Sequence, residues 1–90
     1  MEVSVVWEEN ALSSINNAFE YIRQFSVQAA SDYVIALVEF GNSLGLFPLK
    51  YNLCSVRTLK KFQLRCVNFR NHMFVYEFTG KRVSILRIFH

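Results

Sequence analysis

Three residues of this sequence could carry chemistry: Lys61, Arg65 and His90. Arginine and lysine can stabilise the charge of a pentavalent phosphorane, and histidine or lysine can move protons, so the combination suits RNA cleavage. Lys61, Gln63 and Arg65 alternate, which in a strand places them on one side. The alternative is that the two cations are solvent-exposed strand charges and that His90 is a frayed terminus.

The common enzyme signatures are missing from the sequence. It contains no GxGxxG, GxxxxGK[ST], HExxH or GxSxG pattern. Most carboxylates lie in the first half of the chain, and no pair of them is placed for acid–base work. If this protein does chemistry, its cations and histidines must carry it.

No metal or other cofactor is expected. The two cysteines, Cys54 and Cys66, match no zinc spacing and form no CxxC, and His72 and His90 have no companion ligands nearby. We expect both cysteines to be reduced and structural, as in a cytosolic protein. His72 is expected to pack or hydrogen-bond within a sheet, and Tyr76 to be a core aromatic.

The charges are divided along the chain. Residues 1–49 hold one basic and six acidic residues, a net charge of −5, whereas residues 50–90 hold nine basic and one acidic residue, a net charge of +8. This asymmetry predicts one face for an anionic partner, with Lys60, Arg70 and Arg87 as candidate contacts. The alternative is that the basic residues are only solvent-exposed charges on the surface of a strand. Arg87 precedes His90 by three positions, so a regular strand would place the two on opposite sides.

The front half of the sequence reads as a strand and two helices. Residues 3–7 are β-branched and aromatic, which favours a strand. Leu12, Ile15, Phe19 and Ile22 step by three and four, which is the period of a helix with one buried stripe. Ser26 can cap a second helix that ends near Gly45. The short connection predicts an antiparallel helical hairpin.

The back half reads as strands. A loop covers residues 48–57, and apolar residues then alternate with polar ones up to Cys66. A reversal over residues 67–71, a strand over 72–78, a tight turn over 79–81 and a last strand over 83–89 complete the chain. The predicted fold class is α+β, with the order β-α-α-β-β-β and the helical hairpin packed on a small, largely antiparallel sheet.

Size and composition predict one domain over residues 1–90. The chain has 90 residues, of which 52% are hydrophobic and 19% charged, as in a folded protein. It lacks an apolar run of about 20 residues, so no transmembrane helix is expected. Its first residues lack the pattern of a signal peptide, and we expect a cytoplasmic protein.

Fragments along the whole chain resemble the RelE/ParE superfamily of toxins from type II toxin–antitoxin systems. Leu44-Gly45-Leu46-Phe47-Pro48 is similar to the "L-x-x-F-P" that ends the family's second helix, and residues 74–78 with 83–90 are similar to its closing hairpin. The front of the chain supplies further fragments: Val6-Trp7, Ala11, Ala18-Phe19-Glu20-Tyr21-Ile22 and Phe25-Ser26-Val27-Gln28-Ala29-Ala30.

The resemblance implies a toxin that a cognate antitoxin protein from the same operon holds inactive in a hetero-oligomer. ParE-like members poison DNA gyrase and need no nuclease site, whereas RelE-like members cut mRNA on the ribosome. RelE-like nucleases carry an arginine two residues before the "VY" dipeptide, where this chain has Met73. A thioether cannot replace a guanidinium at a phosphate.

The resemblance is therefore closer to ParE, because the two long helices and Met73 both point that way. It implies growth inhibition and plasmid stabilisation through gyrase, without an enzymatic activity of the toxin itself. Two alternatives stay open. One is a RelE-like endoribonuclease that acts on ribosome-bound mRNA with Lys61, Arg65 and His90. The other is an inactive member that only binds its antitoxin.

Overall fold

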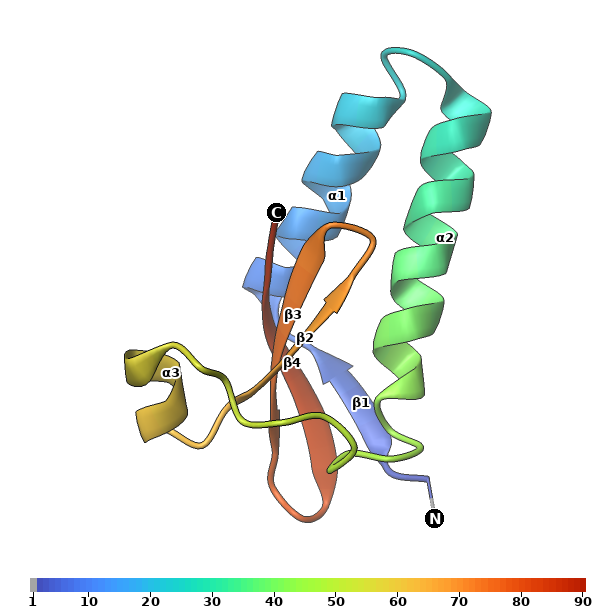
Figure 1. Ribbon diagram of the computed structural model, residues 1–90. Coiled ribbons are helices and arrows are strands. Elements are labelled where there is room, and N and C mark those ends of the chain that lie inside the picture. The colour runs from blue at the N-terminus through green and yellow to red at the C-terminus, as the bar shows by residue number, and fades with distance from the viewer. Residues whose placement is uncertain (1) are drawn as a thin grey trace.

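The computed structural model describes residues 2–90, apart from the side chain of Lys60. Its order is β1 (Ser4–Trp7), α1 (Glu9–Ile22), α2 (Val27–Ser43), α3 (Arg57–Lys61), β2 (Arg65–Phe69), β3 (His72–Phe78) and β4 (Arg82–Phe89) (Figure 1). The predicted α+β fold with the order β-α-α-β-β-β is confirmed, and the short helix α3 is added to it.

The four strands form one sheet in the order β1-β4-β3-β2. β4 pairs in parallel with β1, whereas the pairs β3–β4 and β2–β3 are antiparallel, so the sheet is largely antiparallel as predicted. The register between β3 and β4 shifts once, where Val75 pairs with Arg87 but Tyr76 pairs with Ile85. At this bulge, the alternation of β4 side chains between the two faces of the sheet shifts by one residue at Leu86.

The helices α1 and α2 form the predicted hairpin, which covers one face of the sheet and projects beyond it (Figure 1). The Ser26 hydroxyl group accepts a hydrogen bond from the Ala29 backbone N–H across 3.1 Å, which confirms the predicted cap of α2. Ala11 and Ile15 of α1 are buried, but Leu12 is 53% exposed. The prediction of Leu12 in the buried stripe was therefore wrong.

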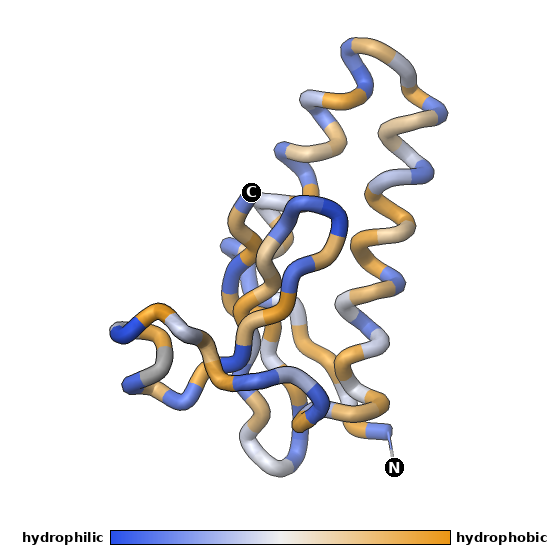
Figure 2. Tube along the Cα trace, viewed as in Figure 1, coloured by the Kyte–Doolittle hydropathy of each residue, from blue (hydrophilic) through white to orange (hydrophobic). Residues whose placement is uncertain are grey.

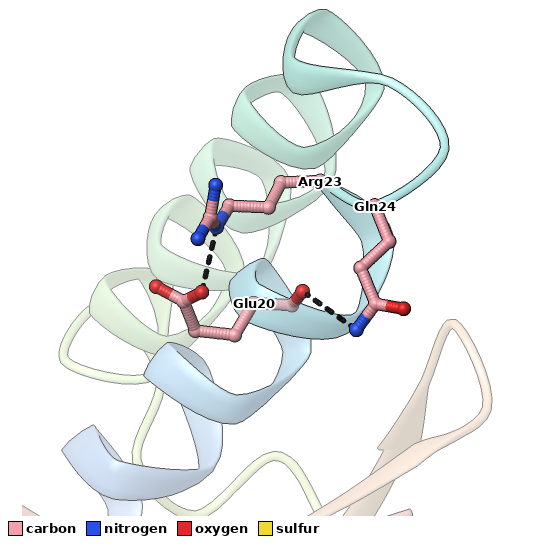
Figure 3. A network of polar contacts seen from close by, with 3 residues as sticks. All are labelled: Glu20, Arg23 and Gln24. Carbon is pink, nitrogen blue, oxygen red and sulfur yellow. Dashed lines mark hydrogen bonds and ion pairs between the residues drawn. The ribbon is translucent and has the colours of Figure 1, made fainter.

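A small polar network closes the C-terminal end of α1 (Figure 3). Arg23 Nε lies 2.6 Å from Glu20 Oε2, and the Gln24 side-chain amide donates to the Glu20 carbonyl oxygen across 3.5 Å. The Arg23–Glu20 contact is the single ion pair among the residues that the structure describes. Because it is exposed and screened, it adds little to stability.

The main core lies between the sheet and the hairpin, and a smaller core lies on the other face of the sheet. The main core holds Phe74, Tyr76, Val83, Ile85 and Ile88 of the sheet against apolar residues of α1 and α2. Apolar residues recur along both helices and the strands that they cover (Figure 2). Cys54, Leu64 and Val75 form the smaller core beneath the loop that contains α3.

The segment before β2 differs from the prediction. Lys61 ends a helix, Gln63 has a positive φ of 57°, and the strand begins only at Arg65. Non-local bonds fix this start, because the Cys54 N–H donates to the Leu64 carbonyl oxygen and Leu53 bridges to Arg65. The predicted reversal over 67–71 is also too long: β2 runs to Phe69, and the chain turns at Arg70 and Asn71.

The two cysteines form a disulfide, which corrects the prediction of two reduced thiols. The Cα atoms of Cys54 and Cys66 lie 4.8 Å apart. The prediction rested on the expected compartment, whereas the fold lays the stretch around Cys54 alongside the start of β2. The bond therefore joins the two ends of the segment that carries α3.

None of the helices described in the structure is long and apolar enough to cross a membrane.

Candidate functional site

The structure does not bring Lys61, Arg65 and His90 together. Lys61 is exposed at the end of α3, and Arg65 Nη1 donates to the Tyr51 carbonyl oxygen across 2.6 Å. Arg65 pairs with Tyr76 of β3, while His90 follows Phe89, which pairs with Met73. Three residues of an extended strand span about 10 Å, and Arg65 and His90 also lie on either side of β3. The three residues share no common site in this arrangement.

A groove of about 800 Å³ lies between α1 and the end of β4. Its polar and aromatic lining residues come from four elements: Asn10, Ser13, Ser14, Asn17 and Tyr21 of α1, Tyr33 of α2, His72 of β3, and Arg87 and Phe89 of β4 with His90 after it. Arg87 and His90 both border this groove. Their side chains nevertheless lie on opposite sides of the strand end, as predicted, because Arg87 pairs with Val75 of the smaller core whereas the His90 ring lies beside His72.

Two histidines meet at the floor of this groove. The His72 and His90 ring centroids lie 5.0 Å apart, and His72 is only 7% exposed. His72 Nδ1 lies 3.0 Å from the Arg70 carbonyl oxygen, which can only accept, so Nδ1 carries a hydrogen. Nε2 is therefore the basic nitrogen of the neutral ring. The expectation that His72 is buried and hydrogen-bonded agrees with these contacts.

Tyr33 of α2 contacts both His72 and Arg70. Its hydroxyl group donates to the Arg70 carbonyl oxygen across 2.7 Å and lies 3.0 Å from His72 Nδ1. Burial raises the pKa of Tyr33, and the nearby charge of Arg70 partly opposes this rise. The phenol therefore stays protonated at neutral pH. Sequence reasoning missed Tyr33, because its helical spacing shows only an aromatic beside the apolar stripe of α2.

The described residues that line the groove include Arg87 but no Asp or Glu. The Arg87 guanidinium lies 6.0 Å from the Phe89 ring centroid and is exposed. Arg70 contacts this corner through its carbonyl oxygen, while its guanidinium lies 5.6 Å from the Phe69 ring centroid. The predicted contact Lys60 has a side chain outside the described part of the structure.

A second surface combines exposed apolar and basic side chains. We call it the 46–62 surface, after the residues between the end of α2 and the start of β2 (Figure 1). Its exposed apolar residues are Leu46, Phe47, Leu49, Leu53, Val56 and Phe62, and its exposed basic residues include Lys50, Arg57 and Lys61. Clusters of exposed apolar side chains often mark sites of protein–protein contact.

Among the described residues, no three His, Cys, Asp or Glu side chains gather in one place.

Comparison with known proteins gives a family and a fold. The model of the family described as "ParE toxin of type II toxin-antitoxin system, parDE" matches residues 5–90. A solved structure titled "Chromosomal ParDE TA system from P. aeruginosa" superposes with a TM-score of 0.80 at 18% identity, over 99% of this chain and 96% of that chain. No curated protein sequence matches this chain.

Proposed function

Because the chain belongs to the ParE toxin family of type II toxin–antitoxin systems, we propose that it is a growth-inhibiting toxin that a cognate antitoxin neutralises. We further propose that its target is DNA gyrase and that it acts in the cytoplasm. The family match over residues 5–90 is the observation that carries the proposal. The ParDE title of the superposing structure supports an antitoxin partner.

The 46–62 surface suits an antitoxin that is both acidic and amphipathic. Phe47 is 68% exposed and Leu49 62% exposed, with Lys50 beside them in the chain. Aromatic and aliphatic anchors dominate binding energy at interfaces, and complementary charge speeds association. An acidic segment with an apolar face would cover both kinds of side chain. The resulting complex would be a toxin–antitoxin hetero-oligomer.

Gyrase is favoured over mRNA because the described side chains form no assembled set of cationic groups for RNA cleavage. Arg65 is engaged with the Tyr51 carbonyl oxygen, and Met73 packs against the smaller core around Val75. A thioether in such a position cannot stabilise a phosphate charge. Inhibition of gyrase requires binding alone and no catalytic residue of the toxin.

The proposal is tested by inducing the chain alone in bacteria and by adding the purified chain to gyrase. We expect growth arrest, and we expect loss of supercoiling with accumulation of cleavage complexes. The antitoxin encoded beside the toxin gene should reverse both effects. Unchanged supercoiling at saturating toxin, together with growth arrest, would exclude gyrase. Absence of growth arrest would instead indicate the inactive, antitoxin-binding member.

The RNA-cleavage alternative has its own test. An Arg65→Ala, His90→Ala double variant should keep full toxicity if gyrase is the target. Relief of growth arrest with loss of mRNA cleavage in the double variant would support the ribosome-dependent nuclease. Folding of the variant is checked by circular dichroism, because Arg65 bonds to the backbone of the preceding loop.

The antitoxin surface is tested with Phe47→Asp and with a matched control. We expect Phe47→Asp to weaken the antitoxin complex by about tenfold or more, since it places a charge in an apolar contact. Leu12→Asp is the control, because Leu12 is an exposed apolar residue on α1 and is not part of the 46–62 surface. Equal weakening by both variants would argue against this surface.

A further inference from the structure

We propose that His72 and His90 form a two-histidine binding site for a divalent transition-metal ion that prefers imidazole nitrogen, the class of Zn²⁺, Ni²⁺ and Cu²⁺. The sequence predicted no metal, because the two histidines are far apart in the chain and have no companion ligands nearby. The fold brings their ring centroids to within 5.0 Å of each other. The proposal does not depend on the cellular target, since it rests on these two side chains.

The two histidines are neighbours across the ends of β3 and β4. Met73 pairs with Phe89 in this antiparallel pair of strands, so the next residue outward on each strand, His72 and His90, lie opposite one another. Both rings are on the face of the sheet that the helices cover, where Tyr33 of α2 contacts His72. Residues directly opposite each other have Cβ atoms about 4.5–5.5 Å apart, so one ion can reach both rings.

The hydrogen bonds of His72 prepare its other nitrogen as a ligand. Nδ1 carries a hydrogen that faces the Arg70 carbonyl oxygen across 3.0 Å, and the Tyr33 hydroxyl group lies 3.0 Å from the same nitrogen. Histidines that bind metals commonly donate their second ring N–H to a backbone carbonyl oxygen, which fixes the tautomer and the direction of the ring. Nε2 is left with a lone pair, and a metal ion accepts that electron pair.

Both rings can be reached by an ion from the groove. The hydrogen bonds described for the His72 ring are made by Nδ1, and among the described residues no buried side-chain nitrogen or oxygen atom lacks a hydrogen-bond partner. Nε2 of His72 is therefore accessible from the groove that this residue lines. His90 is exposed after the end of β4, so its ring can rotate to bring a nitrogen to the same ion.

The ring spacing and the ligand type select the class of metal. Two imidazoles that bind one tetrahedral ion at metal–nitrogen distances of about 2.0–2.1 Å have ring centres about 5 Å apart. The observed separation of 5.0 Å and the tilt of 50° between the ring planes fit such an arrangement. Imidazole nitrogen suits Zn²⁺, Ni²⁺ and Cu²⁺, whereas Mg²⁺ prefers oxygen ligands. Water completes the coordination of the ion, since the described groove lining holds no Asp or Glu.

The test is a calorimetric titration of the purified chain with Zn²⁺, Ni²⁺, Cu²⁺ and Mg²⁺ as separate probes. The chain carries no histidine tag, and the bond between Cys54 and Cys66 is kept oxidised so that free thiolates cannot bind the ions. We expect one ion per chain, with Cu²⁺ bound more tightly than Ni²⁺ or Zn²⁺ and with no binding of Mg²⁺. Saturating Zn²⁺ should also raise the midpoint of thermal unfolding by several degrees, because the folded state holds the two rings together.

Two matched variants locate the ion. His90→Ala should weaken Zn²⁺ binding by about tenfold or more, because one of the two ligands is lost. Asn17→Ala alters another exposed polar residue of the groove lining and should change the affinity by less than about twofold. Both side chains are exposed, so we expect both variants to fold.

The ligands are identified by the electron paramagnetic resonance spectrum of the Cu²⁺-bound chain. It should show coupling to two imidazole nitrogens, and to one in His90→Ala. Any of three results would overturn the proposal: no saturable binding of Zn²⁺ or Cu²⁺ below about 1 mM, equal affinity of His90→Ala and the unchanged chain, or equal loss in His90→Ala and Asn17→Ala. An affinity that His90→Ala leaves unchanged would place the ion elsewhere on the chain.

Discussion

The Tyr76 hydroxyl group donates a hydrogen bond to the Pro48 carbonyl oxygen across 2.7 Å, although 28 residues separate the two in the chain. Tyr76 is fully buried at the centre of β3. Its phenol therefore joins the middle of the sheet to the loop that begins the 46–62 surface. The position of that surface relative to the core depends in part on this one bond.

Removing the hydroxyl group in Tyr76→Phe should lower the free energy of unfolding by about 1 kcal/mol, because the Pro48 carbonyl oxygen loses its partner in a partly buried place. Urea denaturation followed by circular dichroism measures the loss. Tyr21→Phe is the control, since Tyr21 is largely exposed, and its change should stay within about 0.5 kcal/mol. Equal stability of Tyr76→Phe and the unchanged protein would contradict this account of the bond.

Gly41→Ala should weaken the packing of the helical hairpin on the sheet. A Cβ atom at Gly41 would run into the six-membered ring of Trp7 and would approach Ile85 Cδ1 at 3.0 Å. The Trp7 ring cannot easily move, because its Nε1–H donates to Asn42 Oδ1 across 2.8 Å. Alanine improves helix propensity by about 1 kcal/mol, but overpacking costs about 1–3 kcal/mol.

The net loss expected for Gly41→Ala is about 1 kcal/mol, measured by urea denaturation, with a change in Trp7 fluorescence. Glu39→Ala on the exposed side of α2 is the matched control, and it should be close to neutral. A more stable Gly41→Ala protein with unchanged fluorescence would show that the ring is free to shift.

The disulfide should contribute about 3 kcal/mol to stability in oxidising buffer. Cys54 and Cys66 are 12 residues apart, and closing a loop of that size restricts the unfolded chain by roughly this amount. Dithiothreitol should lower the midpoint of thermal unfolding of the unchanged protein. A Cys54→Ser, Cys66→Ser double variant should melt at the lower temperature with or without the reductant. A midpoint that does not respond to the reductant in the unchanged protein would count against the bond in solution.

Stability should fall in alkali because of two tyrosines. Burial raises the pKa of Tyr33 and of Tyr76 above the ordinary value of 10.0. In the unfolded chain these phenols lose their protons first, so above about pH 10 the folded state holds more protons. The free energy of unfolding then decreases as pH rises, until the folded phenols also ionise.

The slope is measured by urea denaturation between about pH 9 and pH 11. A Tyr33→Phe, Tyr76→Phe double variant should start from a lower stability and show a shallower decline. Tyr21→Phe, which alters an exposed phenol, should leave the slope unchanged. A decline of the same steepness in all three proteins would mean that other groups cause it.

Most of the fold followed from local patterns and from the family resemblance. Helix periodicity and the Ser26 cap located α1 and α2, and the Thr79–Lys81 turn located the hairpin of β3 and β4. The segment before β2 could not be predicted in this way. Phe62 fitted an alternating strand pattern, yet its side chain is 67% exposed, because bonds between the Cys54 region and Leu64 decide where the strand begins.

The groove could be predicted only in part. His90 was a candidate from the sequence, but Tyr33 and His72 join it only through contacts between separate elements. The groove is formed by α1, α2 and the ends of β3 and β4, and no sequence spacing indicates that these elements lie side by side. The basic half likewise divided into two places: Arg87 lies in the groove, while Lys61 lies on the 46–62 surface.

The position of β4 in the sheet also determines when the protein can complete its fold during synthesis. β4 follows the other three strands in the chain, yet it lies between β1 and β3 and is the only strand that β1 contacts in the sheet. A nascent chain still waiting for β4 can form its helices and the β2–β3 pair, but not the complete sheet. Completion of the sheet thus waits for β4, and a chain that ended before β4 would lack the strand that joins β1 to β3.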